Sequence, residues 1–450
     1  MKNPNFVSPF RLSSLLRREK NPKLALQLFL NPNPTPHPKP FRYPLPSYDL
    51  IISKLGRAKM FQEMEQILHQ LKQETRFAPE EIIFCNVINF YGRARLPDRA
   101  LQMFDQIPSF RCKITVKSVN SLLNALLRCR EFERMREVLV GIDKFAIPDT
   151  CTYNILIHAC CVSGSLDGAW KVFDEMLRKG VPSNAVTFGT LISGLCAASK
   201  LKEAFRLKED MVRIFEVKPN AFVYTSLIKG LCKIKELNLA IKLKEEMLDL
   251  KIGLDSAVYS TLIGGLFKVG RKEEVLAVLK EMRGNGCKPD TVTYNAMIHG
   301  FCTEKDFESA CHVLNEMVEG GLNPDIISYN IIIRGYCKAG KLKEANDLFE
   351  DLPRRGYAPD VISYRILFDG FIDGMQLGEA AFILDEMIFK GHFPHSGSIN
   401  KFVDGLYQAG NMDVLWGVLN SLGDKNTWRV LICSVCKKDW LPDLLEIVGH

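Results

Sequence analysis

The chain has 450 residues, of which 47% are hydrophobic and 25% charged, a composition typical of a folded protein and not of a disordered one. Its net charge of +7 is concentrated at one end, because residues 1–44 carry eight basic residues and one acidic residue while the rest of the chain is balanced. This distribution excludes a repeat region that is basic throughout, so any attraction for an anionic partner must depend on how charge is sorted between faces. No run of about 18 apolar residues predicts a membrane span.

The first 44 residues have the composition of a targeting segment. Residues 1–18 combine Arg, Lys, Ser and Leu without an acidic residue, as organellar transit peptides do, although a plain basic tail would have the same composition. Residues 21–30 fit a half-repeat, and a proline-rich connector follows from Asn31 to Pro40. We therefore assign residues 1–44 to a transit peptide and proline-rich linker with a half-repeat. The Leu- and Arg-bearing start with few Ser or Thr predicts a mitochondrial location, with the plastid as the alternative.

From Thr150 onward the sequence repeats itself with a period of 35 residues and one spacing of 36. A fixed period in this range indicates a solenoid, in which each unit buries its apolar face only against its neighbours. Function is then expected on a long shared surface and not in a deep pocket. The period is marked by one aromatic residue per repeat: Tyr153, Phe188, Tyr224, Tyr259, Tyr294, Tyr329 and Tyr364.

One repeat, residues 291–325, predicts two short amphipathic helices. Its first half places Tyr294 and Phe301 on one side at helical spacing, and a polar break at 304–306 predicts the turn. Gly320 and Gly321 are expected to end the second helix, and Asp325 to cap the next one. The small residues Ala169, Ala204, Ala240, Ala310, Ala345 and Ala380, which recur at one place, predict close helix packing.

Applied to the whole chain, this pattern predicts an all-α fold. We expect a right-handed α-solenoid superhelix of about ten to twelve helix-turn-helix repeats of 35 residues. The solenoid is predicted at 45–424, with a shortened unit at 396–424. A C-terminal partial repeat or cap is predicted at 425–450, with Trp428 in the aromatic place.

The cysteines predict packing and not metal binding. A small apolar side chain suits the buried side of a repeat's first helix. Cys433 and Cys436 have C-x-x-C spacing, but no second pair completes a zinc site. No metal site and no cofactor are predicted. Six of the 14 cysteines share one place in the repeat: Cys161, Cys196, Cys232, Cys302, Cys337 and Cys436.

No catalytic motif is found in the sequence. It contains no GxxxxGK[ST] phosphate loop and no HExxH helix, and none of its eight histidines is followed by x-E, as a zinc deaminase requires. The chain is therefore predicted to bind a partner and not to be an enzyme.

Residues 326–360, IISYNIIIRGYCKAGKLKEANDLFEDLPRRGYAPD, resemble the repeat of the pentatricopeptide repeat family, and the resemblance covers about 45–440. The similar tetratricopeptide repeat has a period of about 34 and a W-x2-L-G-x2-Y signature, which is absent here. The resemblance is to the pure-repeat (P-type) subfamily. It implies sequence-specific binding of single-stranded RNA in an organelle, one base per repeat, which supports RNA stabilisation, processing, splicing or translation by occupying a site.

In this family the fifth and last residues of a repeat read one base, and a hydrophobic second residue wedges against it. The resemblance implies U for Asn120 with Asp149, Asn295 with Asp325, and Asn330 with Asp360. It implies a pyrimidine for Asn154 with Asn184, and G for Thr225 with Asp255 and Ser260 with Asp290. Gly189 with Asn220 has no fifth side chain, so its base stays open. The implied core is 5′-UYNGGUU-3′, where Y is a pyrimidine and N any base.

Other positions follow from the same register. The implied wedge residues are Val186, Phe222, Val292 and Ile327, whereas Cys151 and Ala257 are smaller. Lys233, Lys268 and Lys338 share one place and are predicted to contact phosphate, with solvated helix ends as the alternative. No base is assigned to the outer pairs Asp49 with Glu80, Cys85 with Thr115, and Arg365 with His395.

A second hypothesis is a protein-interaction scaffold, for example a factor associated with an organellar ribosome. Degenerate repeats would then serve as docking surfaces, and their fifth and last residues would be scrambled. The orderly Asn, Thr or Ser with Asp or Asn between residues 120 and 360 favours RNA. The irregular end repeats remain candidates for docking organellar proteins.

Overall fold

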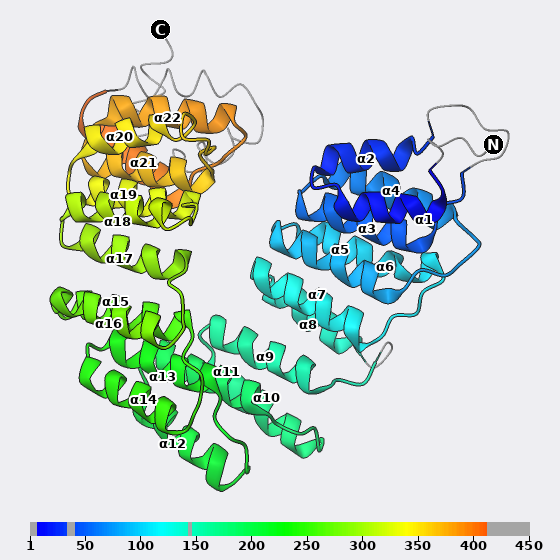
Figure 1. The fold of residues 1–450 in the computed structure, drawn as a ribbon, viewed down its shortest axis with the longest axis horizontal. Coiled ribbons are helices and arrows are strands. Elements are labelled where there is room, and N and C mark those ends of the chain that lie inside the picture. Colours follow the sequence, from blue (N-terminus) through cyan, green and yellow to red (C-terminus); the bar gives the residue numbers. More distant parts are fainter. Residues whose placement is uncertain (1–6, 34–40, 143–145, 412–450) are drawn as a thin grey trace. The chain divides into compact units, whose positions relative to one another are not determined.

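The computed structural model describes residues 7–33, 41–142 and 146–411, and every regular element in these ranges is a helix (Figure 1). The chain divides into two compact units, Met1–Leu227 and Ile228–His450, with the division inside α13 (Ala221–Lys233). The prediction of an all-α chain of helix-turn-helix repeats is confirmed. The predicted cap at 425–450, Trp428 and the Cys433/Cys436 pair lie outside the described residues.

In the first unit each repeat is a pair of helices joined by a short turn. The first helices of successive repeats pack on one another, α3 on α5, α5 on α7, α7 on α9 and α9 on α11. One hydrophobic core runs from Leu12 to Ala159. The pairs are α1 (Pro9–Arg18) and α2 (Pro22–Leu30), α3 (Leu45–Arg57) and α4 (Phe61–Gln73), α5 (Glu81–Arg93) and α6 (Pro97–Gln106), α7 (Val116–Cys129) and α8 (Phe132–Val140), α9 (Thr150–Val162) and α10 (Leu166–Arg178), and α11 (Ala185–Ala197) and α12 (Leu201–Arg213).

The second unit continues the same pattern. Its first helices also pack in succession, α15 on α17, α17 on α19, α19 on α21 and α21 on α23. After α14 (Leu237–Asp249), the helices are α15 (Ser256–Lys268) and α16 (Val275–Gly284), α17 (Thr291–Thr303) and α18 (Phe307–Glu319), α19 (Ile326–Lys338) and α20 (Leu342–Asp351), α21 (Val361–Asp373) and α22 (Leu377–Phe389), and α23 (Ser396–Gln408).

The last residue of one repeat caps the first helix of the next. Asp325 accepts a hydrogen bond from the Ser328 amide at 2.9 Å, as predicted, and the Asp325 amide donates back to the Ser328 hydroxyl at 3.3 Å. This reciprocal arrangement is a capping box. The predicted turn at 304–306 is also confirmed, and Gly321 ends α18 with a left-handed φ of 76°. Further capping boxes join Asp149 to Thr152, Asn184 to Thr187 and Asp360 to Ser363.

Glycine and cysteine meet where neighbouring repeats stack. A Cβ on Gly194 of α11 would lie 2.4 Å from Sγ of Cys161 in α9, the preceding first helix. Gly265 and Cys232 repeat this relation at 2.7 Å. Because only glycine leaves room for the sulfur, the predicted packing role of the cysteines is confirmed for these repeats. The recurring alanines predicted to permit close packing are fully buried: Ala169, Ala204, Ala240, Ala310, Ala345 and Ala380.

The N-terminal segment is more ordered than its composition suggests. The interpretation of residues 21–30 as a lone half-repeat is incomplete, because α2 is paired with α1 (Pro9–Arg18) and both pack on α3. Leu12 and Phe29 are fully buried, and the Ser13 and Ser47 hydroxyls lie 2.8 Å apart. Sequence reasoning missed α1 because its basic, acid-free composition is shared with transit peptides. The targeting role of residues 1–18 stays a prediction.

Among the helices of the described ranges, none combines the length and the apolar character needed to cross a membrane.

Candidate nucleic-acid interface

The second residue of many repeats is an apolar side chain exposed to solvent. Val, Ile and Phe are usually buried, so their repeated exposure at one place indicates a contact surface. The four predicted wedge residues all belong to this set, and Ile82 and Ile362 occupy the same place in repeats to which no base is assigned. The set is Ile82, Val186 and Phe222 in the first unit and Val292, Ile327 and Ile362 in the second, each exposing between 45% and 59% of its surface.

Two predicted reading pairs of the first unit are joined by hydrogen bonds. Asn120 donates from Nδ2 to Oδ1 of Asp149 at 3.0 Å, and Asn154 donates from Nδ2 to Oδ1 of Asn184 at 3.4 Å. Each fifth residue lies at the start of the second turn of α7 or α9, and each last residue caps the next first helix. The repeat register therefore brings residues about 30 positions apart into contact.

A third residue, which sequence reasoning missed, completes these two pairs. The hydroxyl of Thr152 donates to Oδ1 of Asn120 at 2.8 Å, and that of Thr187 donates to Oδ1 of Asn154 at 2.7 Å. Both threonines are the third residue of the following repeat and are fully buried. Because the hydroxyl binds the carbonyl of the amide, it holds Nδ2 toward the last residue. The recurrence of Thr or Ser at 152, 187, 293, 328 and 363 was the available sequence signal.

The second unit holds the fifth asparagine differently. Asn330 donates from Nδ2 to Oδ1 of Asp360 at 3.3 Å, but within the described residues its Oδ1 has no hydrogen-bond partner. Asn330 is only 5% exposed. The hydroxyl of Ser363 donates to Asp360 at 2.9 Å, as that of Thr152 can donate to Asp149 at 2.9 Å, but within the described residues it makes no bond to Oδ1 of Asn330. The buried Oδ1 of Asn295 is likewise without a partner in the part of the chain described. An unpaired buried carbonyl costs about 1–3 kcal/mol.

The fifth residues that are predicted to read G bond to their own helices. Thr225 donates to the Ala221 carbonyl at 2.7 Å, and Ser260 donates to the Ala257 carbonyl at 3.2 Å. Asp290 accepts from the Ser256 hydroxyl at 2.7 Å. These pairs are therefore not preassembled through their side chains, because each hydroxyl must rotate before it can meet a base.

The one predicted reading pair not yet described, Gly189 with Asn220, has a different geometry. The ring of Phe222 takes the place that a fifth side chain would occupy, since a Cβ on Gly189 would lie 2.4 Å from it. Asn220 accepts from the Val223 amide at 3.2 Å and so caps α13.

Two of the aspartates that end repeats, Asp149 and Asp290, are held in their ionised form. Burial alone would raise the pKa of Asp149, but hydrogen bonds from Thr152 and Asn120 outweigh it and lower the pKa below its ordinary value. Burial likewise opposes the hydrogen bonds from Ser256 and Thr293 that lower the pKa of Asp290. Hydrogen bonds to a carboxylate favour its charged form, so these side chains are acceptors at neutral pH.

Hollows of the surface coincide with predicted reading positions. The Asn154 hollow, about 630 Å³, is lined by Asn154, Asn184 and Val186 among others. The Asn330 hollow, about 500 Å³, contains the pair Asn330 and Asp360 together with the apolar residues Ile327 and Ile362. Each of these hollows therefore combines a predicted reading pair with exposed apolar side chains.

Basic residues surround the Asn330 hollow. Arg334 and Lys338 line it, and both also line an adjoining hollow of about 660 Å³ that contains Arg365 and His395. Lys338 was predicted to contact phosphate, whereas Arg334 was not singled out. Burial and the charges of Lys338, Lys268 and Arg334 lower the pKa of His299, which lines the Asn330 hollow as well. Lys233, Lys268 and Lys338 are all exposed.

The outer repeats lack this arrangement. The guanidinium of Arg365 donates from Nε to the Phe393 carbonyl at 2.9 Å, and its Nη1 lies 3.3 Å from Nε2 of His395. In the repeat 45–80, burial and then the charge of Glu80 raise the pKa of Asp49. Two neighbouring carboxyl groups disfavour a polyanion at that place.

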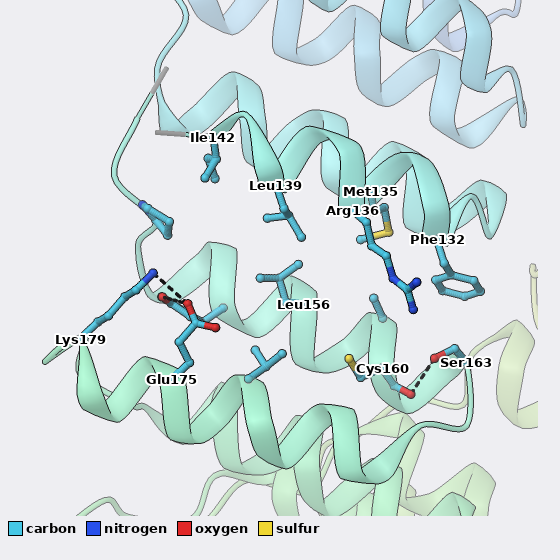
Figure 2. A pocket seen from close by; sticks show the side chains of 14 residues that line it. Phe132, Met135, Arg136, Leu139, Ile142, Leu156, Cys160, Ser163, Glu175 and Lys179 are labelled. Atoms are coloured by element: carbon cyan, nitrogen blue, oxygen red, sulfur yellow. Dashed lines mark hydrogen bonds and ion pairs between the residues drawn. The ribbon is translucent and has the colours of Figure 1, made fainter. Parts of the chain in front are cut away.

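Another hollow lies apart from the predicted reading residues. It has a volume of about 370 Å³ and lies between α8 on one side and α9 and α10 on the other (Figure 2). Leu139, Ile142 and Leu156 give it an apolar lining, and Lys179 pairs with Glu175 at 2.8 Å at one end. The second helix of this repeat, α8, ends at Val140 after nine residues, whereas α10 has 13.

Within the described ranges, no group of three or more His, Cys, Asp or Glu side chains could hold a metal ion.

Comparison with known proteins identifies the repeat. The family model described as "PPR repeat family" matches residues 148–197, 183–233, 219–268, 254–303, 289–335 and 324–373, and the model described as "PPR repeat" matches residues 82–112. Together these matches cover more than half of the chain.

Relatives in Arabidopsis thaliana carry the same repeat. A pentatricopeptide repeat-containing protein is 54% identical over 242 residues, which are 45% of this chain and 51% of that protein. A mitochondrial pentatricopeptide repeat-containing protein is 28% identical over 42% of this chain and 46% of its own length. The small ribosomal subunit protein mL103 is 27% identical over 46% of this chain and 50% of its own length. The chain thus spans about half the length of these curated relatives.

Among solved structures, that of the pentatricopeptide repeat protein PPR10 in complex with an 18-nt psaJ RNA element is similar with a TM-score of 0.40 and 20% identity, over 98% of this chain and 64% of that chain. The matched repeat models and the helix pairs that they coincide with place this chain in the pentatricopeptide repeat family.

Proposed function

We propose that this chain is a pure-repeat pentatricopeptide repeat protein that binds single-stranded RNA and reads one base per repeat. The observation that carries this proposal is the Asn330 hollow. It combines a buried amide that has an unpartnered carbonyl, the carboxylate of Asp360 and the exposed apolar side chains of Ile327 and Ile362. Arg334 and Lys338 add positive charge at the same place.

The chemistry of this hollow fits a nucleobase better than it fits a peptide side chain. The amide of Asn330 offers an acceptor and a donor side by side, which match the N3–H donor and an adjacent carbonyl of uracil. The two isoleucines can cover the faces of a flat ring, and the cations can neutralise the flanking phosphates. The same reasoning extends to Asn295 because its Oδ1 is also buried and unpartnered within the described residues.

We further propose that the protein acts by occupying its RNA site and not by catalysis. A bound RNA segment would be shielded from exonucleases or held free of secondary structure, which supports stabilisation, processing, splicing or translation. The mitochondrion is the proposed location, supported by the composition of residues 1–18 and by the mitochondrial relatives, with the plastid as the alternative.

Binding of the full chain to a short strand that contains 5′-UYNGGUU-3′, compared with a shuffled strand at two salt concentrations, tests the proposal. We expect tighter binding to the core strand, and weaker binding to both strands at higher salt because phosphate contacts release counterions. The register is tested with Thr225→Asn, which should replace the preference for G at the fourth base with a preference for U. Equal binding of the wild-type protein to both strands contradicts the proposal.

A protein-docking role is the second candidate, for the outer repeats. It is supported by the acidic pair Asp49 and Glu80, by the internally bonded Arg365, and by the relative that is a ribosomal protein. Co-sedimentation of the full chain with purified organellar ribosomal subunits, with and without competing core RNA, tests this role. Sedimentation that core RNA leaves unchanged would support docking through these repeats.

A further inference from the structure

The second helix of the repeat 361–395, which is labelled α22 in Figure 1, exposes large apolar side chains. Phe382 exposes 72% of its surface and Phe389 exposes 86%. The two lie about two turns apart and therefore on the same face of the helix. Met375, in the turn between α21 and α22, exposes 62%. We call Met375, Phe382 and Phe389 the α22 stripe. Single exposed apolar residues are ordinary, but a group of them marks a contact surface.

The stripe stands where neighbouring repeats have polar residues or glycine. The equivalent residues one and two repeats earlier are Gly340, Asp347 and Arg354, and Lys305, His312 and Glu319. All six are exposed, although each of their repeats is followed by another whose first helix packs on theirs. The stacking of a further repeat thus leaves this face open. The stripe is therefore not an edge that a following repeat would cover.

The charges beside the stripe have one sign. Every charged residue of α22 is acidic, and all are exposed: Glu379, Asp385 and Glu386. Residues three or four positions apart are neighbours on a helix surface, so all three carboxylates lie beside Phe382. A surface that complements the stripe is therefore apolar along its middle and basic along its sides.

We propose that the α22 stripe docks a basic amphipathic helix of a partner protein. Its apolar face would lie on Met375, Phe382 and Phe389, and its Lys or Arg residues would face the carboxylates of α22. The stripe residues are spaced by seven, which is the spacing at which two helices pack along a shared seam. This inference goes beyond the proposed RNA binding, whose reading residues belong to first helices and their caps. It rests on the docking role proposed for the outer repeats and gives that role a surface and a class of partner.

Charge argues against other occupants of the stripe. A second copy related by a twofold axis would bring the same acidic residues together. Residues 412–450 contain five acidic and four basic residues, so this segment does not supply basic flanks. An anionic membrane surface would be repelled by the carboxylates of α22.

The first experiment uses a synthetic amphipathic peptide of about 18 residues as the probe, with Leu on one face and Lys on the other. A peptide with Glu in place of Lys is its control. We expect the full chain to bind the Lys peptide at least about tenfold more tightly than the Glu peptide, as fluorescence anisotropy measures. Failure of the wild-type protein to bind the Lys peptide overturns the proposal.

The second experiment removes the stripe. Phe382→Asp combined with Phe389→Arg gives α22 the residues of the preceding repeat and leaves the net charge unchanged. This double variant should bind the Lys peptide at least about tenfold more weakly. Val318→Ser, which removes a single exposed apolar side chain from α18, is the control and should leave the affinity unchanged within about twofold. Equal affinities of the wild-type protein and the double variant overturn the proposal.

The third experiment reverses the charge beside the stripe. Glu379→Lys combined with Asp385→Lys keeps the stripe and should make the protein prefer the Glu peptide to the Lys peptide. An unchanged preference overturns the role of the carboxylates. Because the replaced side chains are all exposed, every variant is expected to fold, which melting temperatures check.

Two further measurements separate this proposal from its alternatives. Sedimentation velocity tests the second copy: a wild-type dimer that becomes monomeric in the Phe382→Asp, Phe389→Arg protein overturns the proposal. Affinity for the core RNA strand should be the same in the wild-type protein and in this double variant, and a loss in the variant would place the stripe in the RNA interface and overturn the proposal. Equal binding of core and shuffled strands by a wild-type protein that still binds the Lys peptide overturns the proposed RNA binding alone.

Discussion

The hydroxyl of Thr152 donates a hydrogen bond of 2.8 Å to Oδ1 of Asn120, although the two residues belong to successive repeats. The same threonine also donates from its amide to Asp149, the last residue of the repeat that contains Asn120. One residue therefore positions both members of a reading pair, Asn120 through its hydroxyl and Asp149 through its amide. Thr152, the third residue of the repeat 150–184, therefore influences the base through Asn120 and Asp149, the fifth and last residues of the preceding repeat, without contacting the base itself.

Replacing this hydroxyl should weaken base discrimination. Thr152→Val keeps the volume but removes the hydroxyl that holds the Asn120 amide toward Asp149, so we expect the preference for U at the first base to fall by about fivefold or more, which corresponds to about 1 kcal/mol. Thr152→Ser retains the hydroxyl and should restore the preference. Ser109→Ala is the control, because that exposed hydroxyl bonds only locally, to the Gln106 carbonyl at 2.7 Å. Equal preferences in all three proteins would show that the hydroxyl has no positioning role.

Asn330 should be more important for binding than for folding. Its buried Oδ1 lacks a partner within the described residues, so Asn330→Ala removes an unsatisfied acceptor and should change the free energy of unfolding by less than about 1 kcal/mol. RNA binding should weaken about 5- to 100-fold because the pair with Asp360 is lost. Chemical denaturation and binding to the core strand are measured on the same preparation. Asn346→Ala, which removes an exposed amide bonded to Glu350, is the control and should change neither by much.

The basic residues of the Asn330 hollow should determine part of the salt dependence. Arg334→Ala and Lys338→Ala are each expected to reduce the slope of log K against log[salt] by about 0.7, the value for one phosphate contact on a single strand. The loss should be similar for core and shuffled strands. Lys343→Ala, on the second helix α20, serves as the control and should leave the slope unchanged. A slope that is the same in all four proteins would remove these residues from the interface.

Binding should also depend on pH through His299. Burial and the nearby cations lower the pKa of its imidazole, so the free protein takes up this proton only below the ordinary value of about 6.5. A bound phosphate neutralises those cations and raises the pKa, so RNA binding is coupled to proton uptake and affinity should rise as the pH falls below neutrality. His299→Ala should flatten this part of the profile. If the affinity of the wild-type protein instead decreases as the pH is lowered below neutrality, the assignment to His299 is wrong.

The stacking of repeats should depend on the close approach of Gly194 to Cys161. Gly194→Ala places a methyl group 2.4 Å from the sulfur, and overpacking of this kind costs about 1–3 kcal/mol. Cys161→Ala should recover part of the loss when it is combined with Gly194→Ala. Gly264→Ala in α15 is the control, since its added Cβ meets nothing within 4 Å and should stabilise the helix by about 0.5–1 kcal/mol. Urea denaturation of the four proteins gives the comparison.

The sequence predicted the helix pairs and the reading pairs because both follow from one strict period. Asp325 as a cap, the turn at 304–306 and the contact of Asn120 with Asp149 require only the register and the polarity of each position. The exposure of Val292 and Ile327 also follows from their place on the first turn.

Other features depend on contacts between repeats, which a single repeat does not reveal. The role of Thr152 needs the distance to Asn120 of the preceding repeat, and the glycine at 189 could not be interpreted until the ring of Phe222 was placed. The helix α1 was missed because an amphipathic basic segment is compatible both with a leader and with a packed helix, and the packing of α1 shows only in the burial of Leu12.

A double-mutant cycle between Asn330 and the last base of the core tests the central claim most directly. Dissociation constants are measured for the wild-type and Asn330→Ala proteins on 5′-UYNGGUU-3′ and on the strand that ends in C. We predict that the wild-type protein prefers U by about tenfold and that Asn330→Ala abolishes this preference, so that the two changes are strongly coupled. If both proteins show the same preference, so that the effects are additive, Asn330 does not read this base and the account of the interface is wrong.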